Sequence, residues 1–512
     1  MRYEHPSSNP PSQDFNDALT DQLRKTPWFL VSTALHAFVF MLVILLSPDA
    51  AIADLPNTME VAYNEDVPDE PVDDVIPVEP VDVPEVPKVD PVDVPNIDTQ
   101  DHASDVADFN TFDRDDSDFS DQTGEPSLNP NVIGLGDGNP GGGDGFGRGD
   151  GLGGPGGRPP HLKTLRAAFD WLKRHQHAKG SWDGDDFIAR AGEPHAKDCQ
   201  CCRGAGANPL HDVGLTGMAI LTYLGAGETH KAGDYRQTVR SGLKWLVDAQ
   251  DAEGCFGARH QGFTYSHAIA SLAMIEAYGM TRSPLFKKPA EKALNFCLSC
   301  QVPYGGWRYG EQGADSDTSV TGWMVMALKS AKLAGMKVPQ RSLDWAVDWI
   351  DQMTDEETGR TGYVMTGAAT VREKGKLEEF PGTESEAMTA AGILVRIFAG
   401  ADPEEDKMIK LGAEQVVVEC LPLWDESRGS IDMYYWYYGT LAMFQVGGSS
   451  WRSWNRAMVP AIVETQRADG CAAGSWDPKG AWGGVGGRIY ATALMALSLE
   501  VYYRYPRVFG LK

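Results

Sequence analysis

The chain has 512 residues and a formal net charge of −27, and 42% of its residues are hydrophobic. This length allows two or three ordinary domains with substantial cores. The acidic balance argues against nucleic-acid binding, which needs a basic surface.

An apolar run near the N-terminus predicts a membrane anchor. Residues 1–27 form a polar tail, and Trp28–Leu46 carry no charged residue over about the length that crosses a bilayer. Arg24 and Lys25 precede the run, which places the N-terminus in the cytoplasm. We therefore expect a single-pass protein of the cytoplasmic (inner) membrane with an extracytoplasmic, periplasmic C-terminal domain. The alternative is a signal peptide cleaved near residue 53.

Two polar residues lie within this run. Ser32 and His36 are four residues apart, so they share one face of the predicted helix. This pattern, followed by a Pro-rich stretch, resembles the anchor of the TonB family. The resemblance implies a partner complex of the ExbB/ExbD proton-channel type, and the alternative is a lone His near the headgroups.

Residues 54–160 predict a disordered linker. They contain 26 acidic and 4 basic residues, so most of the net charge lies here. The first part is rich in Pro and the last part in Gly, and neither can bury enough apolar surface to fold.

From residue 161 onward a short phrase recurs. Trp171 is followed by Gln176, Gly180 and Trp182, and this spacing of aromatic, Gln, Gly and aromatic residues indicates a repeat protein. The Gly ends a helix, and the Gln and the second aromatic residue tie one unit to the next. The residues given this structural role are Gln176, Trp182, Gln250, Phe256, Gln301, Trp307, Gln466 and Trp476.

Two classes of helical segment alternate between residues 161 and 512. The phrase helices are amphipathic and the others are apolar on most sides, as expected for outer and inner helices. The expected outer helices are Leu162–Gln176, Tyr235–Gln250, Lys288–Gln301, Arg341–Met353, Glu404–Cys420 and Trp451–Gln466. The expected inner helices are Val213–Leu224, His267–Tyr278, Ser319–Leu333, Glu386–Phe398, Tyr435–Val446 and Tyr490–Tyr503. We predict an all-α domain, an (α/α)6 toroid.

The phrases and the alternation resemble the prenyltransferase and squalene-oxidase repeats of squalene/hopene cyclases and protein prenyltransferase β subunits. The resemblance implies a terpenoid cyclase-like toroid with an acid motif or a zinc site. Asp315 and Asp317 are the candidate catalytic acids, although Ser316 stands where the cyclase acid is expected. Ser319 stands where the zinc-binding Cys of prenyltransferases is expected, so we expect no metal and no cofactor. Whether the chain is an enzyme stays open.

The N-terminal ends of the inner helices are expected to open at one mouth. Their polar and aromatic residues predict a ligand site for an apolar molecule, such as an isoprenoid. The candidate ligand-binding residues are His211, Asp212, His267, Trp323, Glu386, Tyr435, Tyr438 and Tyr490. Alternatively, Asp212 and Asp317 only cap their helices, and the domain binds an envelope protein.

Eight cysteines all lie in the predicted extracytoplasmic region, so disulfides are permitted. Cys297 and Cys300 could bind zinc, but they lie within a predicted helix without a second matching pair. We expect disulfides or buried thiols.

Overall fold

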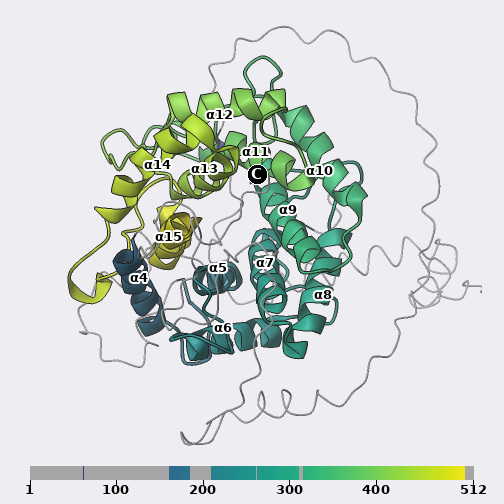
Figure 1. The fold of residues 1–512 in the computed structure, drawn as a ribbon, viewed down its shortest axis with the longest axis vertical. Helices are drawn as coiled ribbons and strands as arrows, with labels where there is room; N and C mark the ends of the chain where they lie inside the picture. Colours follow the sequence, from purple (N-terminus) through teal and green to yellow (C-terminus); the bar gives the residue numbers. More distant parts are fainter. Residues whose placement is uncertain (1–60, 63–160, 185–208, 261, 311–314, 502–512) are drawn as a thin grey trace, which may run out of the picture. The chain divides into compact units, whose positions relative to one another are not determined.

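The structure, a computed structural model, describes residues 61–62, 161–184, 209–260, 262–310 and 315–501. In these ranges twelve α-helices alternate between an inner and an outer layer (Figure 1). The inner helices are α5 (Asp212–Gly225), α7 (Phe263–Thr281), α9 (Thr318–Leu333), α11 (Ala387–Ala399), α13 (Met433–Val446) and α15 (Gly483–Leu499). The outer helices are α4 (Leu162–Arg174), α6 (Arg236–Ala249), α8 (Pro284–Ser299), α10 (Gln340–Met353), α12 (Lys407–Glu419) and α14 (Gly448–Val463). The predicted alternation is confirmed for this part of the chain.

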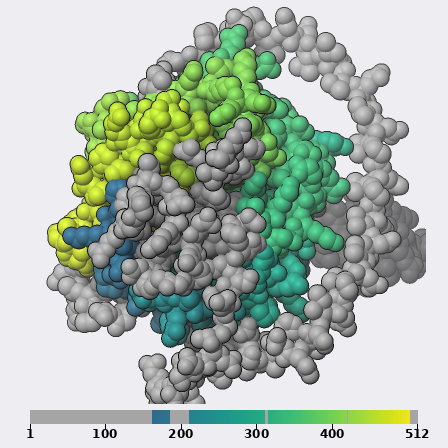
Figure 2. Space-filling view, in the orientation of Figure 1, coloured from purple at the N-terminus to yellow at the C-terminus, as the bar shows by residue number. Residues whose placement is uncertain are grey.

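The inner helices form a closed ring. Each contacts the next inner helix in the sequence, and α15 returns to contact α5 and α4. The first and last helix pairs consequently lie side by side, as the blue and yellow regions of Figure 2 show. The arrangement is an α/α toroid.

Burial follows from the sequence patterns of the two layers. Helix α7 is apolar or small on nearly every side, and nearly all of its residues are buried. Helix α10 instead buries one stripe, and its remaining residues include exposed Asp344 and Asp348. The inner layer therefore forms the core, and the outer layer shields it from water.

The Gln of the repeat phrase joins neighbouring units. The Gln176 side-chain amide donates to the carbonyl oxygen of Gly180 at 2.8 Å and to that of Thr238, on the next outer helix, at 2.9 Å. The same pair of bonds runs from Gln250 to Gly254 and Pro289, from Gln301 to Gly305 and Ser342, and from Gln466 to Gly474 and Thr164. The bond from Gln466 to Thr164 closes the ring, because it joins the last unit to the first.

The second aromatic residue of the phrase joins the two layers. The Trp182 indole N–H donates to the carbonyl of Leu172 on α4 at 2.9 Å, and its backbone N–H donates to Thr216 Oγ1 on α5 at 3.0 Å. Trp307 makes the same bonds to Cys297 and Thr321, and Trp476 makes them to Ile462 and Thr492. These three indoles are fully buried, as expected from their predicted structural role.

Two features differ from expectation. Helix α15 begins seven residues before the predicted start because a glycine-rich stretch extends it, with non-helical backbone at Gly487. Within the stretch predicted as disordered linker, β1 (Val61–Ala62) pairs antiparallel with β2 (Arg372–Glu373). The rest of the linker lies outside the described residues.

None of the described helices combines the length and the apolar character needed to cross a membrane. The predicted span Trp28–Leu46, with Ser32 and His36, lies outside the described residues.

Candidate functional site

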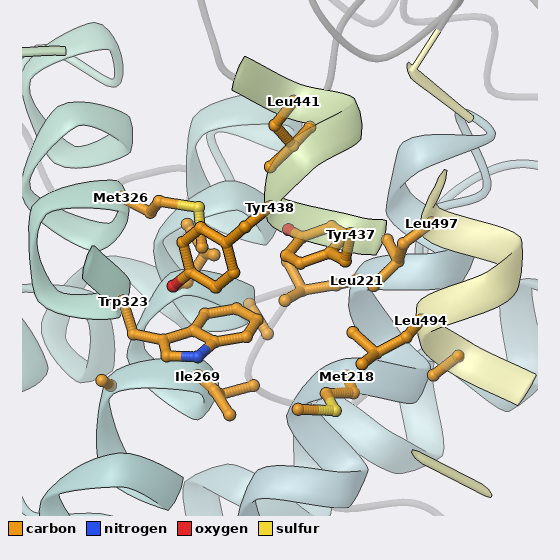
Figure 3. Close-up of a cluster of buried hydrophobic side chains, with 14 of the residues drawn as sticks. Met218, Leu221, Ile269, Trp323, Met326, Tyr437, Tyr438, Leu441, Leu494 and Leu497 are labelled. Atoms are coloured by element: carbon orange, nitrogen blue, oxygen red, sulfur yellow. The ribbon is translucent and has the colours of Figure 1, made fainter. Parts of the chain in front are cut away.

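The predicted ligand ring is occupied by its own side chains near the toroid axis. Trp323 on α9 stacks on Tyr437 of α13, with ring centroids 5.6 Å apart, and meets Tyr438 edge-on at 5.7 Å. All three side chains are fully buried. Figure 3 shows them meeting apolar side chains from the neighbouring inner helices. At this level the interior is a packed aromatic core.

Some predicted ring residues do come together toward the N-terminal ends of the inner helices. The Trp323 indole donates to the Tyr265 hydroxyl at 3.2 Å, and the Tyr434 and Tyr438 ring centroids lie 4.9 Å apart. Burial raises the pKa of the Tyr490 hydroxyl, and the nearby Asp432 carboxylate raises it further. Trp323, Tyr438 and Tyr490 thus belong to one tyrosine-rich cluster, and the Tyr490 phenol stays protonated at neutral pH.

Two predicted ring residues make structural contacts instead. The Tyr435 hydroxyl points outward and donates to the carbonyl of Cys420 at 2.7 Å. The buried Glu386 carboxylate pairs with Arg360 Nη2 at 2.7 Å. Neither arrangement leaves the side chain directed at a ligand.

The start of α5 also differs from the prediction. Asp212 is the first residue of the helix rather than its N-cap, and its carboxylate accepts a hydrogen bond from the Gly184 N–H at 3.0 Å. His211 occupies the capping position, and burial lowers the pKa of its imidazole.

His267 takes the place of the layer-joining Thr in the second unit. Its Nδ1 accepts a hydrogen bond from the Phe256 backbone N–H at 3.1 Å, while Nε2 faces Cys297 Sγ at 3.4 Å. Burial lowers the pKa of His267 to about 3 and raises the pKa of the Cys297 thiol to about 12. Both groups are therefore neutral and structural.

Both states expected for the cysteines, buried thiols and disulfides, occur among the described residues. Cys255, Cys297, Cys300 and Cys420 are buried free thiols. Cys471 is disulfide-bonded.

Asp317 is the N-cap of α9. Its Oδ1 accepts hydrogen bonds from the Val320 N–H at 2.8 Å and from the Ser319 hydroxyl at 3.0 Å, so the predicted capping role is confirmed. The carboxyl group is fully buried, and its Oδ2 has no hydrogen-bond partner. Burial raises the pKa of Asp317 to about 6, although the hydrogen bonds and the Arg308 guanidinium oppose the rise.

A pocket of about 420 Å3 lies beside this cap, between the turn after α8 and helix α10. Asp315 lines it with an exposed carboxylate, which pairs with Arg308 at 3.5 Å. The other lining residues are Val302, Pro303, Tyr304, Gly305, Ser316, Trp349, Gln352 and Val364. The two candidate acids therefore differ in exposure: the Asp315 carboxylate is exposed in the pocket, whereas the Asp317 carboxyl group is enclosed.

The turn at the pocket has an unusual backbone. Gly305 N–H donates to the Val302 carbonyl at 3.0 Å, and Tyr304 takes the left-handed conformation with φ of 60°. Glycine normally occupies such a position because a Cβ atom makes it strained, at a cost of about 1–3 kcal/mol. In the other copies of the phrase the positive φ falls one residue later, on the glycine itself, at Gly180, Gly254 and Gly474. Tyr304 is nonetheless 68% exposed, so burial of its ring does not offset the strain.

Trp349 lines the pocket and differs from its counterpart in the first unit. It holds the place of Trp171 in the repeat, and the Trp171 indole donates to the Cys471 carbonyl in the turn of the adjoining unit at 3.0 Å. The Trp349 indole nitrogen is buried but has no hydrogen-bond partner in the structure. A buried donor without a partner costs about 1–3 kcal/mol and calls for a ligand or water.

Sequence reasoning missed Tyr304, Arg308, Trp349 and Gln352 as site residues. The available signal was the Val302–Gly306 segment, where Pro303 replaces Ala178 and Ala252 of the other turns, and Tyr304 replaces Lys179 and Glu253. In the sequence, this segment is indistinguishable from the rest of the packing phrase unless those two replacements are noticed.

No protein-family model and no curated protein matches the chain. The glycoside hydrolase family 76 α-1,6-mannanase from Salegentibacter sp. HEL1_6 is 12% identical and covers 66% of this chain and 98% of its own, with a TM-score of 0.45. A novel α-amylase from Clostridium perfringens is 13% identical over 67% of this chain and 98% of its own, with a TM-score of 0.42. A family 76 mannosidase from Bacteroides thetaiotaomicron is 11% identical over 67% and 96%, with a TM-score of 0.39.

These findings correct the family resemblance drawn from the repeat phrase. The structural neighbours include family 76 glycoside hydrolase folds rather than squalene cyclases or prenyltransferases, and no repeat-family model matches. The predicted squalene cyclase-like function is therefore wrong, as is its terpenoid cyclase alternative. TonB-like coupling likewise has no matching family model. The phrase recurs because its Gln and Trp side chains satisfy the same backbone groups in each unit.

Proposed function

We propose that this (α/α)6 toroid is a carbohydrate-binding protein that holds a neutral sugar unit in the pocket beside α10. The observation that carries the proposal is the pocket between two units, which is lined both by Trp349, whose indole N–H is unpartnered, and by the strained, exposed Tyr304. A pocket of about 420 Å3 is within the usual range for small ligands.

The lining chemistry supports a sugar. The flat rings of Tyr304 and Trp349 offer apolar faces that can pack on the C–H face of a pyranose. Gln352 supplies both donors and acceptors, and the Trp349 N–H is a donor only. Hydroxyl groups both donate and accept, so a polyhydroxylated ligand can satisfy this mixed set.

The charges favour a neutral ligand. Arg308 and Asp315 pair at 3.5 Å within the lining, so the pocket offers no net charge to a phosphate or an ammonium group. Both side chains keep free hydrogen-bonding positions for hydroxyl groups because the guanidinium has five donors and the carboxylate has two acceptor oxygens.

The arrangement supports binding rather than hydrolysis. Glycoside hydrolysis ordinarily uses two carboxyl groups that flank the bond. Among the described lining residues, Asp315 is the one carboxylate, and Asp317 is enclosed as a helix cap.

Calorimetry with the full chain and a panel of xylo-, cello-, chito- and manno-oligosaccharides tests this proposal. We expect one series to bind with a Kd between about 1 μM and 1 mM, which corresponds to about 8 to 4 kcal/mol. Tyr304→Ala and Trp349→Phe should each weaken that binding at least several-fold. Leu423→Ala, an exposed apolar side chain elsewhere, is the matched control. Absence of binding across the panel, or wild-type affinity in both pocket variants, would refute the proposal.

A further inference from the structure

The aromatic surface of the pocket continues beyond it along α10. The Tyr304 ring lines the pocket and also contacts the Trp345 ring, with centroids 5.1 Å apart and planes at 47°. Trp345 is not a lining residue of the pocket, so Tyr304 bridges the pocket and the helix surface. We call Tyr304 and Trp345 together the outer platform.

The outer platform lies in line with the pocket. Trp345 and Trp349 are four residues apart on α10, which places them on one face about 6 Å apart along the helix. One turn further toward the N-terminus, the Arg341 guanidinium lies over the Trp345 ring, 5.8 Å from its centroid. Aromatic faces therefore follow one another outward from the pocket.

Packing against the toroid core involves Trp349 but neither Trp345 nor Tyr304. Helix α10 buries Ser342, Leu343, Ala346, Ile350 and Met353 against the inner layer, and Trp345 belongs to neither this buried set nor the pocket lining. Tyr304 is 68% exposed and retains a strained backbone. Trp345 beside it is half-buried, and contiguous aromatic side chains that reach the surface in this way mark interaction surfaces.

The surroundings of the platform fit a sugar chain better than a protein partner. Asp344 and Asp348 are exposed on the same helix, next to Trp345 and Trp349. Charged residues are depleted in the core of protein interfaces, whereas carboxylates can accept hydrogen bonds from sugar hydroxyl groups.

We propose that the site binds a chain of at least two consecutive sugar units, one in the pocket and the next stacked on the outer platform of Tyr304 and Trp345. This inference rests on the proposed function and makes it more specific. The ligand is an oligosaccharide or polysaccharide segment rather than a free monosaccharide, and Trp345 determines the preference for length.

Affinity as a function of chain length tests the inference. Xylose, glucose, N-acetylglucosamine and mannose would each be compared with their disaccharides and trisaccharides, using calorimetry and, for weak binders, saturation-transfer NMR. We expect the affinity of the wild-type chain to rise about tenfold from monosaccharide to disaccharide, the size of one added aromatic contact. Trp345→Ala should remove this gain while leaving monosaccharide affinity within about twofold.

Trp349→Phe is the matched comparison because it alters the pocket itself. It should weaken all chain lengths by a similar factor and keep the gain from length. Wild-type affinity that is independent of length, or equal weakening of all lengths by Trp345→Ala, would overturn the two-unit site while leaving the pocket intact. Absence of binding at every length would overturn both proposals.

Discussion

Replacing Asp317 with Asn gives a sharp test of the helix cap behind the pocket. Asn retains a side-chain oxygen that can accept the Val320 N–H and the Ser319 hydroxyl, and Asn is as good an N-cap as Asp. The substitution removes the titrating proton. Its effect on stability should therefore depend on pH.

The magnitude follows from the raised pKa of Asp317, about 6 in the folded chain against 3.8 for an unperturbed carboxyl. Because the folded state keeps the proton after the unfolded state has lost it, the contribution of Asp317 to stability is fully present below pH 3.8. It is lost as the pH rises toward 6. Two pKa units correspond to about 3 kcal/mol, so Asp317→Asn should gain roughly 2–3 kcal/mol relative to wild type between pH 4 and pH 7.

Urea unfolding of both chains at several pH values between 4 and 7 measures this difference. Asp432→Asn is the matched control because Asp432 caps α13 but also pairs with buried Arg372 at 3.0 Å. Removing the carboxylate leaves a buried guanidinium without its counter-charge and should cost about 3–5 kcal/mol at pH 7. A constant difference between Asp317→Asn and wild type across the pH range would refute the account of the enclosed carboxyl group.

Three further outcomes follow from the structure. Tyr304→Gly should weaken sugar binding at least several-fold, as Tyr304→Ala does, while leaving the unfolding free energy unchanged or up to about 1 kcal/mol higher, because glycine relieves the strained backbone; calorimetry and urea unfolding check both parts. Gln466→Ala should lower the unfolding free energy by about 1–3 kcal/mol through loss of the two ring-closing bonds, whereas exposed Gln340→Ala should change it by less than about 0.5 kcal/mol. Trp476→Phe should cost about 1–3 kcal/mol because the Ile462 carbonyl loses its buried donor, and unchanged thermal unfolding would contradict the packing role of the phrase.

The alternation of inner and outer helices could be predicted from the sequence because this alternation depends on the local periodicity of apolar residues. Apolar residues on every side mark an inner helix such as α7, and a single stripe marks an outer helix such as α10. The phrase also predicted the joining role of Gln176 and Trp182, since both act within a short span and on the next unit. These features need no knowledge of long-range geometry.

The site residues were harder to predict because their roles depend on which neighbour each side chain meets. His267 and Glu386 looked like ligand-binding groups in the sequence, yet one replaces a layer-joining Thr and the other pairs with Arg360. The pocket lies where the Trp349 indole N–H is buried without a hydrogen-bond partner. A missing contact between units leaves only a weak trace in the sequence, here the strained turn at Tyr304.

The most direct test of the carbohydrate pocket is NMR of the indole N–H groups in chain labelled with 15N-tryptophan, with the Trp349 signal assigned from Trp349→Phe. Each oligosaccharide of the calorimetry panel would be added in turn. The account predicts that a binding sugar shifts the Trp349 signal as its free N–H gains an acceptor, while the signal of the fully buried Trp307 stays in place. A Trp349 signal that moves with no sugar of the panel, or binding that shifts only other indoles, would contradict it.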